Sequence, residues 1–156
     1  MLESAGPGGF DYVFADLDGR RLYIARTGPT PRMTAFNLNT LETVAEIPTT
    51  NSHGAVVDPK SNHGFISSKP ILMFDTKTMM PIKTIDVQNN PDGMLFDPFS
   101  QRAYSLSHAA PHVTAIDTKD ASVVGTIDLG GMPEQAATDG KGHIYIDVED
   151  RPTSPW

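Results

Sequence analysis

The eight residues SHGAVVDP, at positions 52–59, return in altered form three more times along the chain. The related segments are FDYVFADL at 10–17, PDGMLFDP at 91–98 and PEQAATDG at 133–140. In each segment an apolar run ends on an aspartate: Asp16, Asp58, Asp97 and Asp139. Successive aspartates lie 42, 39 and 42 residues apart. A period of about 40 residues predicts a repeat architecture in which every unit is one supersecondary element. We expect these aspartates, which never vary, to fix hairpins.

A second marker repeats in step with the first. It consists of the segments FNLNT, FDTKT and IDTKD, which begin at Phe36, Phe74 and Ile116. An isoleucine follows the second residue of each segment at a constant distance, at positions 47, 85 and 127. Because two independent markers keep the same spacing, we conclude that the repeat is real and spans most of the chain.

Each repeat has the pattern of short β-strands. Segments such as AVVD, HGFISS and ILMFD are apolar, β-branched or aromatic, and turn residues separate them. No helical stripe is longer than two turns. Four strands in about 40 residues make one blade, so the sequence predicts an all-β propeller. The expected blades cover residues 9–50, 51–90, 91–131 and 132–150, between an N-terminal extension (1–8) and an irregular tail (151–156).

Several segments resemble a known propeller family. YIAR, FISS and YSLS, followed by TAFNLNT, LMFDTKT and TAIDTKD, resemble the YVTN-repeat propellers of the YncE-like and surface-layer type. The resemblance covers about residues 9–150. It implies a ring of about seven blades, and a periplasmic or extracellular location is compatible with it. It implies no particular activity, because such propellers serve varied functions.

The chain holds only about half of such a ring. The fourth repeat stops after its second strand, at HIYIDVED, which leaves about three and a half blades. An open arc exposes strand edges that soluble proteins rarely tolerate. We therefore expect a homodimer whose two-fold axis completes the ring. The alternative is a truncated chain, which the irregular ends MLESAG and RPTSPW favour. A truncated chain could still form the dimer.

Composition excludes several classes of partner. The 156 residues are 38% hydrophobic and 20% charged, as in globular proteins, and no apolar run is long enough to span a membrane. The net charge of -7 speaks against nucleic acid and anionic lipid as partners. Without cysteine, disulfides and thiolate ligands are excluded. The N-terminal residues lack the features of a signal peptide, and the compartment stays open.

Four side chains that can bind a metal or move a proton occupy one repeat position. They stand five residues before the recurring aspartates: Asp11, His53, Asp92 and Glu134. In a propeller this is where the strand lining the channel begins, so we expect all four at the channel mouth. Carboxylates crowded there need compensation, which a divalent cation supplies. The oxygen ligands suit Ca²⁺, Mg²⁺ or Mn²⁺, and the imidazole shifts the preference towards Mn²⁺ or Zn²⁺.

Three further residues are candidates for catalysis. His108 and His112, in the segment SHAAPH, can act as acid or base near the mouth, and Arg26, in ARTGPTPR, can steady a developing oxyanion. Plain structural roles compete with these assignments. Asp92 can cap the PDG turn, His53 can bond a backbone carbonyl, and Arg26 can be a solvated loop charge.

Two functions fit this sequence. The first is a metal-assisted hydrolase acting on a small-molecule ester, lactone or phosphoester, with a layout that resembles lactonase and paraoxonase propellers but lacks their asparagine ligands. The second is a non-catalytic module that recognises a peptide, a cell-wall component or a protein through its loops. No G-x-S-x-G, P-loop or H-E-x-x-H motif is present to decide between them. The acid and histidine set favours the hydrolase.

Overall fold

The strands of the chain form four antiparallel sheets, one per repeat. The computed structural model describes residues 8–88 and 90–149. The first sheet contains β1 (Phe10–Asp16), β2 (Arg21–Arg26), β3 (Arg32–Asn37) and β4 (Thr43–Pro48). The second contains β5 (Ala55–Asp58), β6 (His63–Ile66), β7 (Ile71–Asp75) and β8 (Pro81–Ile85). The third contains β9 (Pro91–Asp97), β10 (Arg102–Ser107), β11 (His112–Asp117) and β12 (Val123–Asp128). The fourth contains only β13 (Pro133–Thr138) and β14 (Ile144–Val148).

The predicted all-β class is confirmed. The described residues contain no helix, and each sheet follows chain order, as successive hairpins require. No helix among them could therefore cross a membrane. The predicted extension (1–8), apart from Gly8, and the predicted tail (151–156) lie outside the described residues.

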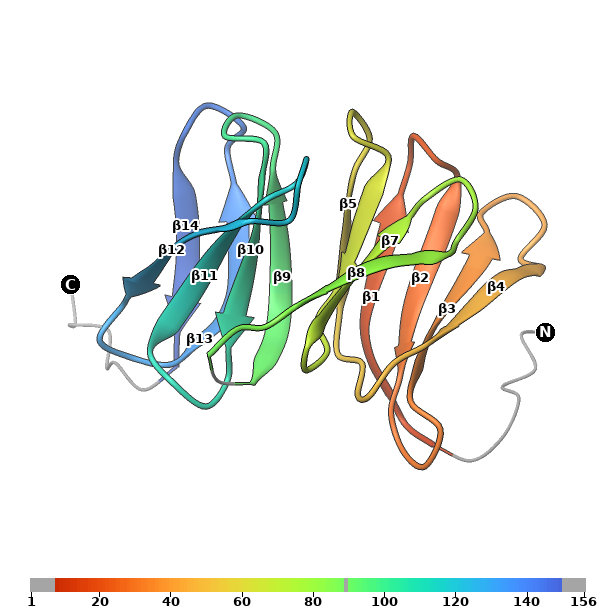
Figure 1. Ribbon diagram of the computed structural model, residues 1–156, viewed down its shortest axis with the longest axis horizontal. Helices are drawn as coiled ribbons and strands as arrows, with labels where there is room; N and C mark the ends of the chain where they lie inside the picture. The colour runs from red at the N-terminus through yellow and green to blue at the C-terminus, as the bar shows by residue number, and fades with distance from the viewer. Residues whose placement is uncertain (1–7, 89, 150–156) are drawn as a thin grey trace, which may run out of the picture.

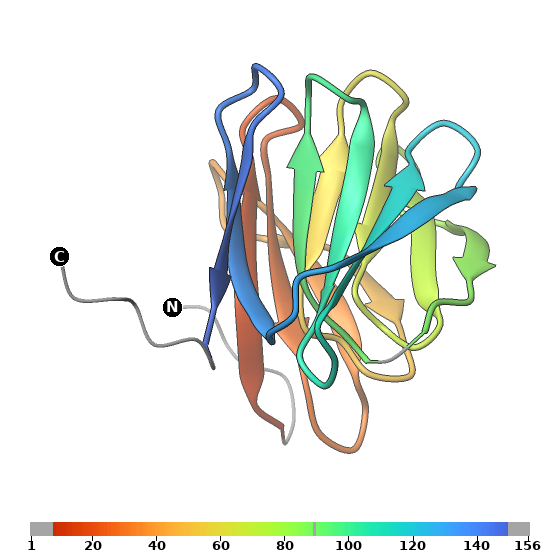
Figure 2. The same cartoon turned by 90° about the vertical axis from the view of Figure 1, so that its left-hand side faces the viewer.

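The sheets stand side by side as the blades of an incomplete fan (Figure 1). The first strand of each sheet lies innermost: β1 contacts β5, β5 contacts β9, and β9 contacts β13. The outermost strands β4, β8 and β12 cross the inner strands at a steep angle, as the twist of a propeller blade demands (Figure 1). In Figure 2 the two-stranded sheet β13–β14, in blue, forms the end of the fan nearest the viewer.

The hydrophobic core lies between successive blades rather than inside any one of them. Tyr23 and Met33 of the first sheet pack with Phe74 of the second, and all three are fully buried. Gly64 makes this packing possible, because a Cβ at that position would lie 2.2 Å from the Phe74 ring. Two more clusters join the second sheet to the third and the third to the fourth. Blade-to-blade burial therefore holds the inner strands in register.

The recurring aspartates fix hairpins, as predicted from their constancy. Asp58 Oδ1 accepts the amide of Lys60 at 2.9 Å. The other oxygen of Asp58 accepts the hydroxyl of Thr118, which belongs to the next blade, at 2.7 Å. Asp97 likewise accepts the hydroxyl of Thr138 from the following blade at 2.6 Å. These aspartates thus also tie neighbouring blades together.

Candidate functional site at the channel mouth

The innermost strands place their candidate residues in equivalent β-bulges. Pairing of β1 with β2 slips between Phe10 and Val13, so that Asp11 and Tyr12 together face one residue of the partner strand. The same slip in β9 encloses Asp92, and in β13 it encloses Glu134. A bulge turns a side chain out of the regular alternation. These three bulges lie at the beginning of β1, β9 and β13, which is the lower edge in Figure 1.

His53 reaches the same place from the segment that precedes β5. Its amide donates to the carbonyl of Ser67 at 3.1 Å, and its own carbonyl accepts the amide of Tyr12 at 2.9 Å. The second of these bonds fastens the first blade to the second directly at the mouth. The imidazole is held in place by backbone bonds at both ends of its residue, and so its position is well defined.

The first group of contacts centres on the His53 imidazole. Its Nδ1 lies 2.8 Å from Asp11 Oδ2 and 3.3 Å from Asp92 Oδ1. On the other side of the ring, the side-chain nitrogen Nδ2 of Asn51 lies 2.8 Å from His53 Nε2. We find no backbone carbonyl bonded to this imidazole in the described part of the chain. The interpretation of His53 as a residue that only caps a carbonyl is therefore not supported.

The second group of contacts centres on Glu134 and His108. His108 Nδ1 lies 3.1 Å from Glu134 Oε2 and 3.9 Å from Asp92 Oδ2. The hydroxyl of Tyr12 donates to Glu134 Oε1 at 2.7 Å and lies 3.4 Å from Asp92 Oδ2. Asp92 therefore belongs to both groups, with one oxygen turned to each. Its side chain contacts residues from three blades instead of merely capping its own turn.

Crowding shifts the protonation of this cluster. Burial raises the pKa of Asp92 above its usual value, and the charges of Asp11 and Glu134 act in the same direction, while the two histidines partly offset them. The hydrogen bond with Glu134 and the charge of Asp92 raise the pKa of His108. Burial, together with the bond to Glu134, raises the pKa of Tyr12 far above its usual range. The phenol thus remains a proton donor at neutral pH.

The arrangement has the chemistry of a cation site. Two sets of three side chains each offer ligand atoms within 4.8 Å of one another: Asp11, His53 and Asp92, and Asp92, His108 and Glu134. The three carboxylates form ion pairs only with the two histidines within the described residues. A pocket of about 200 Å³, lined in part by Asn51, His53, Asp92 and His108, gives solvent and small molecules access to Asp92 and the two histidines.

Two further predicted catalytic residues stand at strand ends beside the loops in which they were predicted. Arg26 ends β2 and is only 4% exposed, with its guanidinium 4.4 Å from the Phe10 ring centre, so it is not a solvated charge. His112 is the first residue of β11, and neither set of ligand atoms includes it.

Tyr12 was missed, although a signal for it exists. It follows Asp11 within the bulge, at the repeat position where the other blades carry Gly54, Gly93 and Gln135. An aromatic residue at a position otherwise held by glycine or glutamine marks a side chain that fills the shared centre. It escaped notice because only the metal-ligating residue types were compared across repeats.

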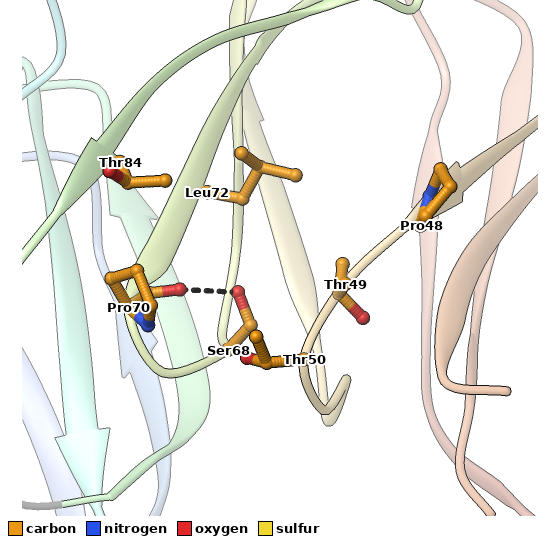
Figure 3. Close-up of a pocket in the computed structure, with 7 residues that line it drawn as sticks. All are labelled: Pro48, Thr49, Thr50, Ser68, Pro70, Leu72 and Thr84. Carbon is orange, nitrogen blue, oxygen red and sulfur yellow. Dashed lines mark hydrogen bonds between the residues drawn. The ribbon is translucent and has the colours of Figure 1, made fainter. Parts of the chain in front are cut away.

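A second pocket lies between the first and second blades and carries no titratable side chain. Its volume is about 220 Å³, and prolines, threonines, a leucine and a serine line it (Figure 3). Within it the hydroxyl of Ser68 donates to the carbonyl of Pro70 at 2.6 Å (Figure 3). This pocket offers neither a base nor a set of metal ligands, so we place the candidate chemistry at the channel mouth.

Comparison with solved structures identifies the architecture. The WD40 β-propeller domain of Doa1 superposes with a TM-score of 0.73 at 14% identity, over 94% of this chain and 50% of that one. The chain forms part of a β-propeller. The WD40 repeats of RRP9 give 0.68 at 14% identity, over 80% and 40% of the two chains. Hydrazine synthase of Kuenenia stuttgartiensis gives 0.69 at 18%, over 82% and 39%.

These similarities establish the fold alone. The identities are low, and the chain spans half or less of the length of each of these structures. No family model and no curated protein matches the sequence. The resemblance to YVTN-repeat propellers therefore stays a prediction, while the β-propeller itself is confirmed.

Proposed function

We propose that the channel mouth binds a divalent cation and uses it to hydrolyse an ester, a lactone or a phosphoester. The observation that supports this most directly is the convergence of three carboxylates and two imidazoles from four blades. Oxygen and imidazole ligands together suit Ca²⁺, Mn²⁺ or Zn²⁺. A bound cation would compensate the carboxylates and lower the pKa of a coordinated water to near neutrality.

Each side chain has a distinct task in this proposal. His53, held by Asn51 and Asp11, would be a fixed ligand together with Asp92. His108 is the most exposed member, at 60%, and so is best placed to exchange protons with the pocket. The oxygen of water would bond to the acyl carbon or phosphorus as the bond to the leaving oxygen breaks. His108 would pass the proton of that water to the leaving oxygen.

The alternative is a module that binds a peptide or a protein through the same face without chemistry. The similarity to WD40 domains is compatible with it but concerns the fold alone. A ligand-binding module does not need a partly buried carboxylate shared between two histidines. For that reason we favour the hydrolase.

Activity with and without chelator separates the two functions. Metal-free protein would be assayed against activated carboxylic esters, lactones and phosphoesters, before and after Ca²⁺, Mn²⁺ or Zn²⁺ is added. We expect hydrolysis that depends on the cation and that His53→Ala abolishes. His143→Ala is the matched control, since His143 also pairs with an aspartate, at 2.9 Å, but on the opposite face of the propeller. The proposal would be contradicted by hydrolysis that persists both with chelator and in His53→Ala. It would also be contradicted if no cation gave any hydrolysis.

A further inference from the structure

We infer that the channel mouth holds two cations bridged by Asp92, and that its substrate is a phosphoester. The inference rests on the proposed function and narrows it. The decisive feature is how the two oxygens of one carboxylate are divided. Asp92 Oδ1 lies 3.3 Å from His53, whereas Asp92 Oδ2 lies 3.9 Å from His108 and 3.4 Å from the Tyr12 hydroxyl. A carboxylate in this position is able to give one oxygen to each of two ions.

The ligand atoms fall into two sets that share one carboxylate. Asp11, His53 and Asp92 lie within 4.8 Å of one another, and so do Asp92, His108 and Glu134. Within the first set His53 lies 2.8 and 3.3 Å from the two carboxylates. Within the second set His108 lies 3.1 and 3.9 Å from its two carboxylates. Each set already has an imidazole and two carboxylates, which is a sufficient protein contribution to a catalytic ion.

The two positions differ in their exposure to solvent. In the first set Asp11 and His53 are 30% and 29% exposed, and Asp92 is 16% exposed. In the second set His108 is 60% exposed. A ligand that is ordered before binding costs less entropy to fix than a mobile one. The first ion should accordingly bind more tightly than the second.

Charge selects the substrate. The three carboxylates carry three negative charges, and the neutral imidazoles carry none. A single divalent ion leaves one net negative charge, which repels an anionic phosphoester, whereas two ions leave one net positive charge and attract it. Two ions about 3.5 to 4 Å apart also stabilise the attacking and the leaving oxygen of an in-line displacement at phosphorus. A carboxylic ester or lactone is uncharged and gains less from such a pair.

The hydrolysis needs no further reactant. The oxygen of one water forms the new bond to phosphorus, and the electron pair of the broken phosphorus–oxygen bond leaves with the alkoxide. One proton of that water is transferred to the alkoxide and gives the alcohol. The Tyr12 hydroxyl donates to Glu134 Oε1 and so orients this ligand of the second ion.

Titration with Mn²⁺ alone tests the inference on the whole chain. Calorimetry gives the number of ions, and low-temperature electron paramagnetic resonance shows whether two of them are magnetically coupled through a bridge. We expect two ions per chain with unequal affinities and a coupled spectrum. Asp92→Asn should abolish the coupling, Glu134→Gln should weaken only the second ion by about tenfold or more, and His143→Ala should change neither. Circular dichroism confirms that each variant is folded.

The possible results separate the two proposals. One bound Mn²⁺ per chain, or two without coupling, would overturn the bridged pair and leave a single-ion hydrolase intact. No binding of Mn²⁺, and none of Ca²⁺ or Zn²⁺ in the same titration, would remove both. With two ions bound, the native protein should hydrolyse a phosphoester at least tenfold faster than a carboxylic ester with the same leaving group. Equal rates would overturn the assignment of the substrate.

Discussion

Asp92 Oδ1 lies 3.3 Å from the Nδ1 atom of His53, one repeat earlier in the chain. The contact joins the starts of the second and third blades, whose innermost strands β5 and β9 also contact each other. The pair therefore marks the mouth of the channel, and it explains how residues distant in sequence form one cluster. The following predictions test the cluster and the fold that positions it.

Removal of the Tyr12 hydroxyl should loosen the cluster without disturbing the strand. In Tyr12→Phe the carboxylate of Glu134 loses a donor at 2.7 Å, which should lower the free energy of unfolding by about 1 kcal/mol. Urea denaturation measures this change. Under the proposed function, kcat should also fall by about tenfold with little change in KM. Tyr145→Phe, at an exposed tyrosine, is the control, and an equal effect of both substitutions would contradict the role of Tyr12.

The contact between Gly64 and Phe74 should tolerate no side chain. In Gly64→Ala the new Cβ would lie 2.2 Å from the Phe74 ring, and the core between the first two blades would have to open. We expect destabilisation of about 1 to 3 kcal/mol, measured by thermal or urea unfolding. Gly125→Ala provides the comparison, because nothing lies within 4 Å of the added Cβ there. A Gly64→Ala protein as stable as Gly125→Ala would show that the blades are packed differently.

Acid should weaken the hydrogen bond that Thr118 donates to Asp58. Burial by itself raises the pKa of Asp58, but hydrogen bonds from Thr118 and from the hairpin lower it below its usual value. A carboxylate with a lowered pKa in the folded state stabilises the fold above its unfolded pKa of about 3.9. That stabilisation is lost as the pH falls through the folded pKa. Thr118→Val should therefore cost about 1 kcal/mol at neutral pH and clearly less below about pH 3.

Urea unfolding of the native protein and of Thr118→Val across this range measures the effect. Thr126→Val, at an exposed position of β12, should have no comparable dependence on pH. A loss of stability in Thr118→Val that is the same at every pH would show that the charge of Asp58 is not involved.

The residues of the cluster could be predicted from the sequence, whereas the bulges that position them could not, and the reason is physical. A repeat places equivalent residues at equivalent points, so that Asp11, His53, Asp92 and Glu134 could be assigned to one end of the channel without coordinates. The bulges that aim the carboxylates have no sequence signature of comparable strength, since they depend on pairing with the neighbouring strand.

The ring should close through pairing of two chains, as expected from the number of repeats. On the free side of the first blade, Phe10 and Val13 are 60% and 59% exposed, and on the fourth blade Tyr145 is 63% exposed. Light scattering should give the mass of a dimer, and Val13→Asp or Tyr145→Asp should shift it towards the monomer. Met80→Asp, at a residue 63% exposed on the second blade, serves as control. A native protein that stays monomeric at all concentrations would contradict this expectation.

The most direct test of the central claim is calorimetric titration of the metal-free protein with Zn²⁺ and with Mn²⁺, for the native chain, His53→Ala and His143→Ala. If the channel mouth is the cation site, the native protein and His143→Ala will bind the ion equally well, and His53→Ala will bind it at least about 10 to 100 times more weakly. Equal affinity of the native protein and His53→Ala, or no binding to the native protein by either ion, would contradict the claim.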